Sequence, residues 1–204
     1  MSLPRPSKIV CVGRNYLEHA KELGNTVPES PLIFLKPPSS LIGEGEAIVL
    51  PPQSSRVEHE GEIAVVIGKT AKNVAAADAY DYVAGYVALN DVTARDLQRI
   101  DDQWTRAKGF DTFCAVGTMK PASEVDPAKL EVICRVNGDI RQQGKAEEMA
   151  FSIPVLIEYI TSVMTLEPGD IIATGTPAGI GPLALGDVVE VEIPGVGKVS
   201  NPVR

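Results

Sequence analysis

The segment at residues 60–68, EGEIAVVIG, constrains the fold more than any other part of the sequence. After two glutamates it is apolar on both faces of the β-pleat, a pattern typical of a strand that is covered on both sides. A second run of this kind, YVAGYVAL at residues 82–89, ends at Asn90 and Asp91. The two runs predict two buried strands.

Further short strands are expected on either side of these runs. The chain contains 18 glycines and 16 prolines, a larger share than the roughly 12% of an average protein, which predicts many turns and a strand-rich fold. Asn137-Gly138 predicts a hairpin between residues 130–136 and 139–144, and the tail at 186–202 alternates with period 2. The other strands are predicted at 8–13, 32–36, 47–50 and 171–175.

Helical spacing is confined to a few scattered segments. Helices are predicted at residues 14–23, 75–81, 93–100 and 152–164, with Gly24 and Asn25 ending the first, Thr93 or Asp91 capping the third, and Ser152 capping the fourth. Few helices without a regular strand–helix alternation indicate the α+β class. Neither repeats nor a low-complexity linker divides the sequence, so one domain over residues 1–204 is expected.

Charge and composition exclude several classes of protein. The sequence has 19 basic and 27 acidic residues, a net charge of −8, which argues against a nucleic-acid partner or an anionic membrane. Neither a spanning apolar run of about 20 residues nor a secretory signal is visible. Three widely spaced cysteines, Cys11, Cys114 and Cys134, are predicted to be apolar fillers in a reducing, cytoplasmic setting.

Three acidic residues are candidates for a metal site. Glu60 and Glu62 are two residues apart, so a strand places both carboxylates on one face, where they repel each other and lose hydration. With Asp91 they form a set of hard oxygen ligands suited to Mg²⁺, Mn²⁺ or Ca²⁺. The alternative from spacing alone is an exposed strand end whose glutamates pair with lysines.

His19 and Glu22 are candidates for a general base and its orienting carboxylate. They are three residues apart on a predicted helix and can therefore touch, and a carboxylate raises the basicity of an imidazole. A solvated helix face with an incidental histidine is the alternative. His59, the other histidine, is on the strand face opposite Glu60 and Glu62 and is the poorer candidate.

Lys108 and the Gly-rich segment TGTPAGIG at residues 174–181 add two weaker signals. An ammonium near paired carboxylates can stabilise an enolate or a carboxylate, although an ordinary surface lysine has the same sequence context. In TGTPAGIG, the backbone N–H groups and the Thr176 hydroxyl can hold a carboxylate, and a plain turn is the alternative.

Seven segments in the same order resemble the fumarylacetoacetate hydrolase family, in its compact acylpyruvate-hydrolase branch. They span nearly the whole chain: GRNYLEHAKE (13–22), PLIFLKP (31–37), HEGEIAVVIGK (59–69), DYVAGYVALNDVTARDLQ (81–98), WTRAKGFDTF (104–113), FSIPVLIEYIT (151–161) and LEPGDIIATGTPAGIGP (166–182). The resemblance implies a β-rich α+β fold with sheets rolled around a metal site, and a homodimer.

The resemblance also assigns roles to single residues. It implies that Glu60, Glu62 and Asp91 bind Mg²⁺ or Mn²⁺, and that His19 and Glu22 form a catalytic dyad in a lid over roughly residues 14–30. Lys108 matches an active-site lysine, with Gly109 after it where some relatives carry Ser. The positions that contact substrate or lid in relatives are Arg14, Tyr16, Gln98 and Thr176.

The reaction that this resemblance implies is cleavage of an acylpyruvate, a small keto acid, to pyruvate and a carboxylic acid. His19, oriented by Glu22, would deprotonate a water that attacks the C4 carbonyl, while the cation and Lys108 offset the charge on the pyruvate enolate. The sequence leaves open oxaloacetate decarboxylation, and isomerisation or hydration of 2-hydroxymuconate-type acids in aromatic catabolism. A binding domain that lost its chemistry and a structural β-module are further alternatives.

Overall fold

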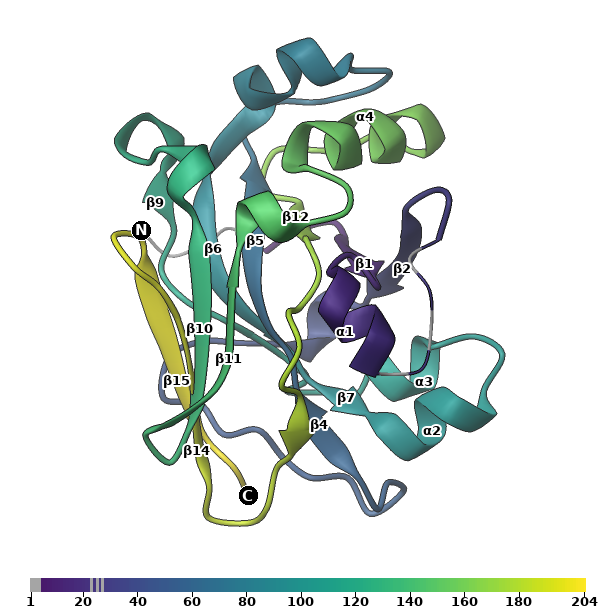
Figure 1. Cartoon of the computed structure of the whole chain (residues 1–204), viewed down its shortest axis with the longest axis vertical. Helices are drawn as coiled ribbons and strands as arrows, with labels where there is room; N and C mark the ends of the chain where they lie inside the picture. The colour runs from purple at the N-terminus through teal and green to yellow at the C-terminus, as the bar shows by residue number, and fades with distance from the viewer. Residues whose placement is uncertain (1–4, 23, 25, 27) are drawn as a thin grey trace.

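The computed structural model describes residues 5–22, 24, 26 and 28–204. Two β-sheets of unequal size face each other and account for most of the architecture (Figure 1). The larger has eight strands, seven of them in the order β2-β1-β12-β5-β6-β8-β3, with β9 also paired to β6. Their bounds are β1 Ile9–Gly13, β2 Leu32–Lys36, β3 Leu41–Ile42, β5 Gly61–Ile67, β6 Val83–Asp91, β8 Cys114–Val116, β9 Lys120–Pro121 and β12 Ile171–Ala173.

The smaller sheet has four strands in the order β11-β10-β14-β15. They are β10 Glu131–Val136, β11 Asp139–Lys145, β14 Val188–Ile193 and β15 Gly197–Pro202, and β10 and β11 form the predicted hairpin at Asn137-Gly138. A third, three-stranded sheet has the order β13-β4-β7, with β4 Val57–His59, β7 Thr93–Ala94 and β13 Gly181–Pro182.

The central strands β5 and β6 are buried on both faces, as the sequence predicts. One face carries Ile63, Val65 and Tyr86, which belong to the main hydrophobic core together with inward residues of β10, β14 and β15. The opposite face carries a second apolar cluster that includes Ala64 and Leu89. The β-rich α+β fold is therefore confirmed.

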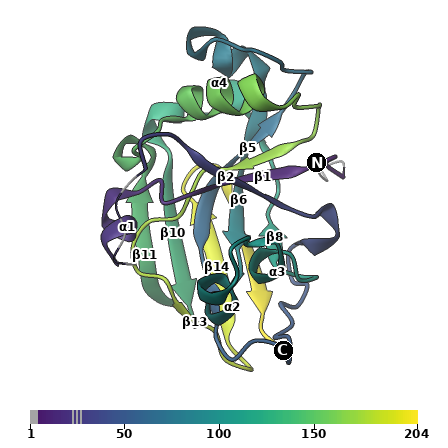
Figure 2. The same ribbon diagram turned by 90° about the vertical axis from the view of Figure 1, so that its right-hand side faces the viewer.

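Four short helices and five 3-10 turns complete the described part. Helix α4 lies at one end of the molecule, and α2 and α3 lie toward the other (Figure 2). None of the helices that the structure describes is long and apolar enough to cross a membrane. The helices are α1 Leu17–Glu22, α2 Arg95–Ile100, α3 Thr105–Lys108 and α4 Ile153–Val163. The 3-10 turns are η1 Pro38–Ser40, η2 Ala76–Tyr82, η3 Ala122–Glu124, η4 Pro127–Lys129 and η5 Ala146–Glu148.

The structure corrects several predicted elements. Residues 47–50 form no strand but a single bridge, Ile48 to Val203, because prolines follow directly and end any ladder. Thr93 belongs to β7, so the third helix starts at Arg95 with Ala94 before it and without a side-chain cap. Ser152 precedes α4, but its side chain makes no cap hydrogen bond.

Two further boundaries differ from prediction. The first helix starts at Leu17, because Arg14 has a φ of 59° and interrupts helical geometry there. Its predicted end at Leu23 and Asn25, and part of the predicted lid at 14–30, lie outside the described residues. The helix predicted at 75–81 is the 3-10 turn η2, Ala76–Tyr82, rather than an α-helix. The cysteines are buried and unpaired, as predicted, and burial raises the pKa of Cys114 to about 12.

Candidate active site

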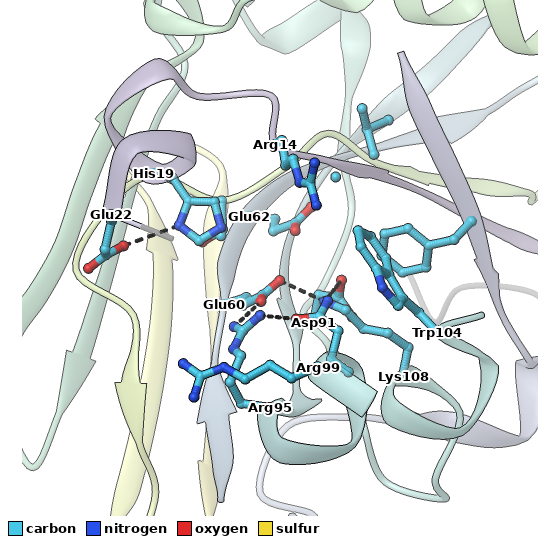
Figure 3. Close-up of a pocket in the computed structure, with 15 residues that line it drawn as sticks. Arg14, His19, Glu22, Glu60, Glu62, Asp91, Arg95, Arg99, Trp104 and Lys108 are labelled. Atoms are coloured by element: carbon cyan, nitrogen blue, oxygen red, sulfur yellow. Dashed lines mark hydrogen bonds and ion pairs between the residues drawn. The ribbon is translucent and has the colours of Figure 1, made fainter. Parts of the chain in front are cut away.

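A cavity of about 340 Å³ opens beside the ends of β5 and β6 (Figure 3). It contains every predicted catalytic and metal-binding residue and three of the four predicted substrate contacts. Its walls come from segments far apart in the sequence, which strand pairing brings together. The lining residues are Val12, Gly13, Arg14, His19, Glu22, Phe34, Glu60, Glu62, Asp91, Arg95, Gln98, Arg99, Trp104, Lys108 and Thr176.

The three carboxylates meet because β5 and β6 pair antiparallel. Gly61 lies opposite Asn90, and the Asp91 N–H donates to the Glu60 carbonyl at 2.8 Å, which brings the last residue of β6 beside the start of β5. Oxygen atoms of Glu60, Glu62 and Asp91 all lie within 4.8 Å of one another. All three residues are buried, so an exposed strand end does not describe them.

Buried cations compensate two of these carboxylates. Lys108 Nζ donates to Glu60 Oε2 and to Asp91 Oδ2, both at 2.7 Å. Lys36 Nζ reaches the second oxygen of Asp91 at 2.6 Å, and Arg95 pairs with the second oxygen of Glu60. Lys108 is itself buried, which excludes an ordinary surface lysine.

Glu62 is the carboxylate without a cation partner among the described residues. Its one described hydrogen bond comes from the Gly175 N–H at 2.7 Å. Burial raises the pKa of Glu62 well above its usual range, and the neighbouring charges of Asp91 and Glu60 raise it further. Burial also raises the pKa of Glu60, but Lys108 and Arg95 outweigh it and hold that pKa well below its usual range.

This donor set fits a hard divalent cation. Three carboxylates supply only oxygen ligands, which Mg²⁺ and Mn²⁺ prefer. Glu62 is buried against two like charges with little compensation, and a cation would offset that repulsion. The residues present therefore fit the metal that the sequence predicts.

The predicted dyad lies on the other side of the cavity. His19 Nδ1 and Glu22 Oε2 are 3.2 Å apart on α1, and Glu22 also accepts from the Gly179 N–H at 3.1 and 3.2 Å. His19 is buried and leaves its Nε2 for the cavity, whereas Glu22 stands at the surface. His59 is absent from the lining; its Nδ1 pairs with Gln142, and burial lowers its pKa.

The predicted substrate contacts divide into two groups. Arg14, Gln98 and Thr176 line the cavity. Tyr16 is not among the lining residues; it is buried and bridges to Met149, with its hydroxyl unpartnered among the described groups. Burial raises the pKa of Tyr16. Its role as a substrate contact stays a prediction.

Six residues of this wall were not predicted from the sequence: Val12, Gly13, Phe34, Arg95, Arg99 and Trp104. Arg95 binds Glu58 at 2.7 Å and Glu60, which ties α2 to the carboxylates. Phe34 and Trp104 meet edge to face, with centroids 5.2 Å apart, and form an apolar side. Arg99 is exposed at the rim. Among these, only the position of Arg95, shortly after Asp91 in TARDLQR, gave a signal that could have been followed.

Comparison with known proteins agrees with this geometry. The chain belongs to the fumarylacetoacetate hydrolase family, because the family model described as "Fumarylacetoacetate (FAA) hydrolase C-terminal" matches residues 8–204. Members of this family are enzymes. The resemblance stated from the sequence is therefore confirmed.

The curated relatives include enzymes named for oxaloacetate. "Oxaloacetate tautomerase FAHD1, mitochondrial" of Arabidopsis thaliana is 47% identical over 198 residues, covering 95% of this chain and 89% of the relative. "Oxaloacetate decarboxylase, mitochondrial" of Dictyostelium discoideum is 46% identical over 195 residues, covering 93% of this chain and 89% of the relative. 

A solved structure adds a different reaction and a metal. The crystal structure of fumarylpyruvate hydrolase from Pseudomonas aeruginosa, in complex with Mn²⁺ and pyruvate, matches with a TM-score of 0.93 at 29% identity. The match covers all of this chain and 91% of that one. Relatives of one fold thus carry hydrolase, tautomerase and decarboxylase names.

Proposed function

We propose that the chain is a divalent-cation-dependent enzyme that forms the enolate of a short 2-oxo acid, with oxaloacetate as its preferred substrate. The observation that carries this proposal is one cavity holding three buried carboxylates, a buried lysine and a histidine with its carboxylate. When bound, the cation supplies Lewis-acid charge to the oxygens at the 2-oxo acid end of the substrate.

The chain's own residues supply the proton transfer. His19, held by Glu22 through Nδ1, would take a proton from C3 of oxaloacetate at Nε2 and return it. Lys108 uses two of its three N–H donors on Glu60 and Asp91, so the third is available to the C2 oxygen as charge develops there. Proton return to C3 or to oxygen gives keto–enol exchange. In decarboxylation the keto form loses its C4 carboxylate as CO₂, the electron pair of the C3–C4 bond forms the pyruvate enolate, and a proton added at C3 gives pyruvate.

Two arginines favour a substrate with a second carboxylate. Arg14 and Arg99 approach the cavity from opposite sides (Figure 3), and neither makes an ion pair with a described carboxylate. Because every acidic residue of the chain lies in the described part, these guanidinium groups have no internal anion. Oxaloacetate is a dianion, and the relatives named for oxaloacetate are 44–47% identical to this chain.

Acylpyruvate hydrolysis, the reaction predicted from the sequence, is the second candidate. The His19–Glu22 pair favours it, because the same base can deprotonate a water that attacks the C4 carbonyl. A monoanionic acylpyruvate would leave one of the arginines without a carboxylate. A homodimer, a cytoplasmic location and the absence of a nucleic-acid partner stay predictions.

Substrate assays test these reactions directly. Purified protein with Mg²⁺ or Mn²⁺ is given oxaloacetate, and enol absorbance and pyruvate release are followed with and without chelator. Acetylpyruvate is assayed in parallel by the loss of its diketone absorbance. Chelator-sensitive turnover of oxaloacetate above that of acetylpyruvate supports the proposal; the reverse order favours the hydrolase, and no turnover of either contradicts both.

A further inference from the structure

Gln142, on β11 of the smaller sheet, uses its whole side-chain amide inside the molecule. Its Nε2 donates to Thr176 Oγ1 and to the Pro177 carbonyl, both at 2.7 Å. Its Oε1 accepts from the Gly61 N–H at 3.0 Å and lies 2.9 Å from His59 Nδ1. A side-chain amide offers two donor hydrogens and two acceptor sites, so Gln142 can make no further hydrogen bond.

The partners of Gln142 are two parts of the candidate site. Gly61 lies between Glu60 and Glu62, so the hydrogen bond to its N–H fixes the strand that carries both carboxylates. Thr176 lines the cavity on the loop that follows β12. One buried side chain outside the cavity therefore connects the carboxylate strand to this loop.

The contact also decides which way the Thr176 hydroxyl points. Thr176 Oγ1 accepts from Gln142 and donates its single proton to the Gly61 carbonyl at 2.9 Å. The hydroxyl therefore has no proton for a substrate carboxylate, contrary to its predicted use as a donor. The Thr176 main-chain N–H, which has no acceptor among the described groups, is the donor that this residue keeps.

We propose that Gln142 is a positioning residue that holds the 174–177 loop against β5, so that the Thr176 main-chain N–H receives the substrate's carboxylate. This inference rests on the proposed function, because it takes a 2-oxo acid as the ligand. Gln142 acts through Thr176 and Gly61 and does not touch the substrate. Its loss should weaken substrate binding more than it slows the chemical step.

The chain offers a matched control on the same strand. Gln143 is the next residue of β11, but it is exposed and donates to Glu131 at 2.8 Å, away from the cavity. Gln142→Met and Gln143→Met replace the same side chain by one of similar volume. A purely structural role for Gln142 would appear in the melting temperature and leave the affinity for the ligand unchanged.

Pyruvate binding to the Mg²⁺-loaded protein, measured by calorimetry, is the main readout, with KM and kcat for oxaloacetate beside it. Q142M should weaken pyruvate binding and raise KM by about tenfold, the cost of one or two neutral hydrogen bonds, with kcat within about threefold. Q143M should match the wild type. A Q142M protein that melts earlier but binds pyruvate normally would overturn the inference.

A double-mutant cycle with Thr176→Val tests the route of the effect. If Gln142 acts through the Thr176 hydroxyl, Q142M and T176V together should cost no more than the larger single effect. Additive losses would contradict that route. If wild-type protein binds no pyruvate, the proposed function itself fails.

Should Q142M fail to fold, Gln142→Glu keeps acceptor atoms toward Gly61 and His59 but lacks the amide N–H. Assayed above neutral pH, Q142E should also raise KM about tenfold, with Mg²⁺ affinity changed less. A wild-type KM in Q142E would overturn the inference.

Discussion

Asp170 directly precedes β12, and Glu62 lies on the neighbouring strand β5. Both are buried carboxylates, yet their surroundings differ sharply. Asp170 is 0% exposed and accepts five hydrogen bonds: from the main-chain and side-chain groups of Ser7 and Lys8, and from the Glu167 N–H. Glu62 is 1% exposed and has one described donor, the Gly175 N–H, with two carboxylates beside it.

The pKa shifts of these two groups run in opposite directions. Burial raises the pKa of Asp170, but the hydrogen bonds from Glu167 and Lys8 outweigh it and lower that pKa. At Glu62 burial is reinforced by Asp91 and Glu60, so the pKa rises. Burial thus does not decide the charge state; the donors do. The surroundings of Asp170 stabilise its charge, whereas those of Glu62 leave a negative charge that the proposed cation would offset.

Removing His19, the proposed general base, should have the largest effect on activity. It leaves the Asp170 and Glu62 carboxylates in place. His19→Ala should lower kcat by about 10²–10⁴-fold, the usual range for loss of a general base. Mg²⁺ affinity, measured by calorimetry, should stay within about threefold of wild type, because His19 is not among the three carboxylates. Wild-type turnover in H19A would remove His19 from the mechanism.

Glu62→Gln should separate metal binding from stability. The variant removes an oxygen ligand and its charge, so Mg²⁺ affinity should fall by more than about tenfold. The metal-free variant should melt no earlier than metal-free wild type, because a buried repulsion has been removed. Unchanged Mg²⁺ titration would contradict the ligand assignment, and a large drop in melting temperature would contradict the comparison with Asp170.

Several parts of this site were predictable because they depend on local pattern. The two-residue spacing of Glu60 and Glu62 in a predicted strand placed both on one face, and the three-residue spacing of His19 and Glu22 in a predicted helix placed them in contact. The order of seven motifs predicted the family, which supported Asp91 and Lys108 as candidates that the sequence had already indicated.

The parts of the site that the sequence did not predict depend on contacts between segments far apart in the chain. Gln142 reaches Gly61, 81 residues away, and Glu22 reaches Gly179, 157 residues away. Neither pairing leaves a periodic signal, since strand register and loop conformation decide it. Tyr16 shows the converse: a motif position matched the family, but the fold turns its side chain into the interior.

Asp170→Asn should cost stability where Glu62→Gln does not. The amide cannot accept from all five donors and loses the charge, so the free energy of unfolding should fall by about 1–3 kcal/mol. Denaturant unfolding near neutral pH measures it, with Asp187→Asn as a control, because that half-buried carboxylate accepts from only two groups, the Ala184 N–H and Asn137 Nδ2. If both variants lose the same free energy of unfolding, the five hydrogen bonds to Asp170 stabilise the fold no more than the bonds to Asp187 do.

The smallest expected effect concerns pH, and it should differ in sign between the two carboxylates. Asp170 has a lowered pKa, so its stabilisation is present above its unfolded pKa and is lost as pH falls through the folded value. Glu62 has a raised pKa, so in metal-free protein its contribution to stability is fully present below the unfolded pKa and is lost as pH rises through the folded value.

Because Mg²⁺ binds the ionised carboxylate, the rise in melting temperature on adding Mg²⁺ should grow as pH increases from acid toward neutral. Melting curves with and without Mg²⁺ across that range measure the difference. In E62Q the increment should be small and lose most of its pH dependence; an increment that shrinks with rising pH in wild type would reverse the assignment of the two carboxylates.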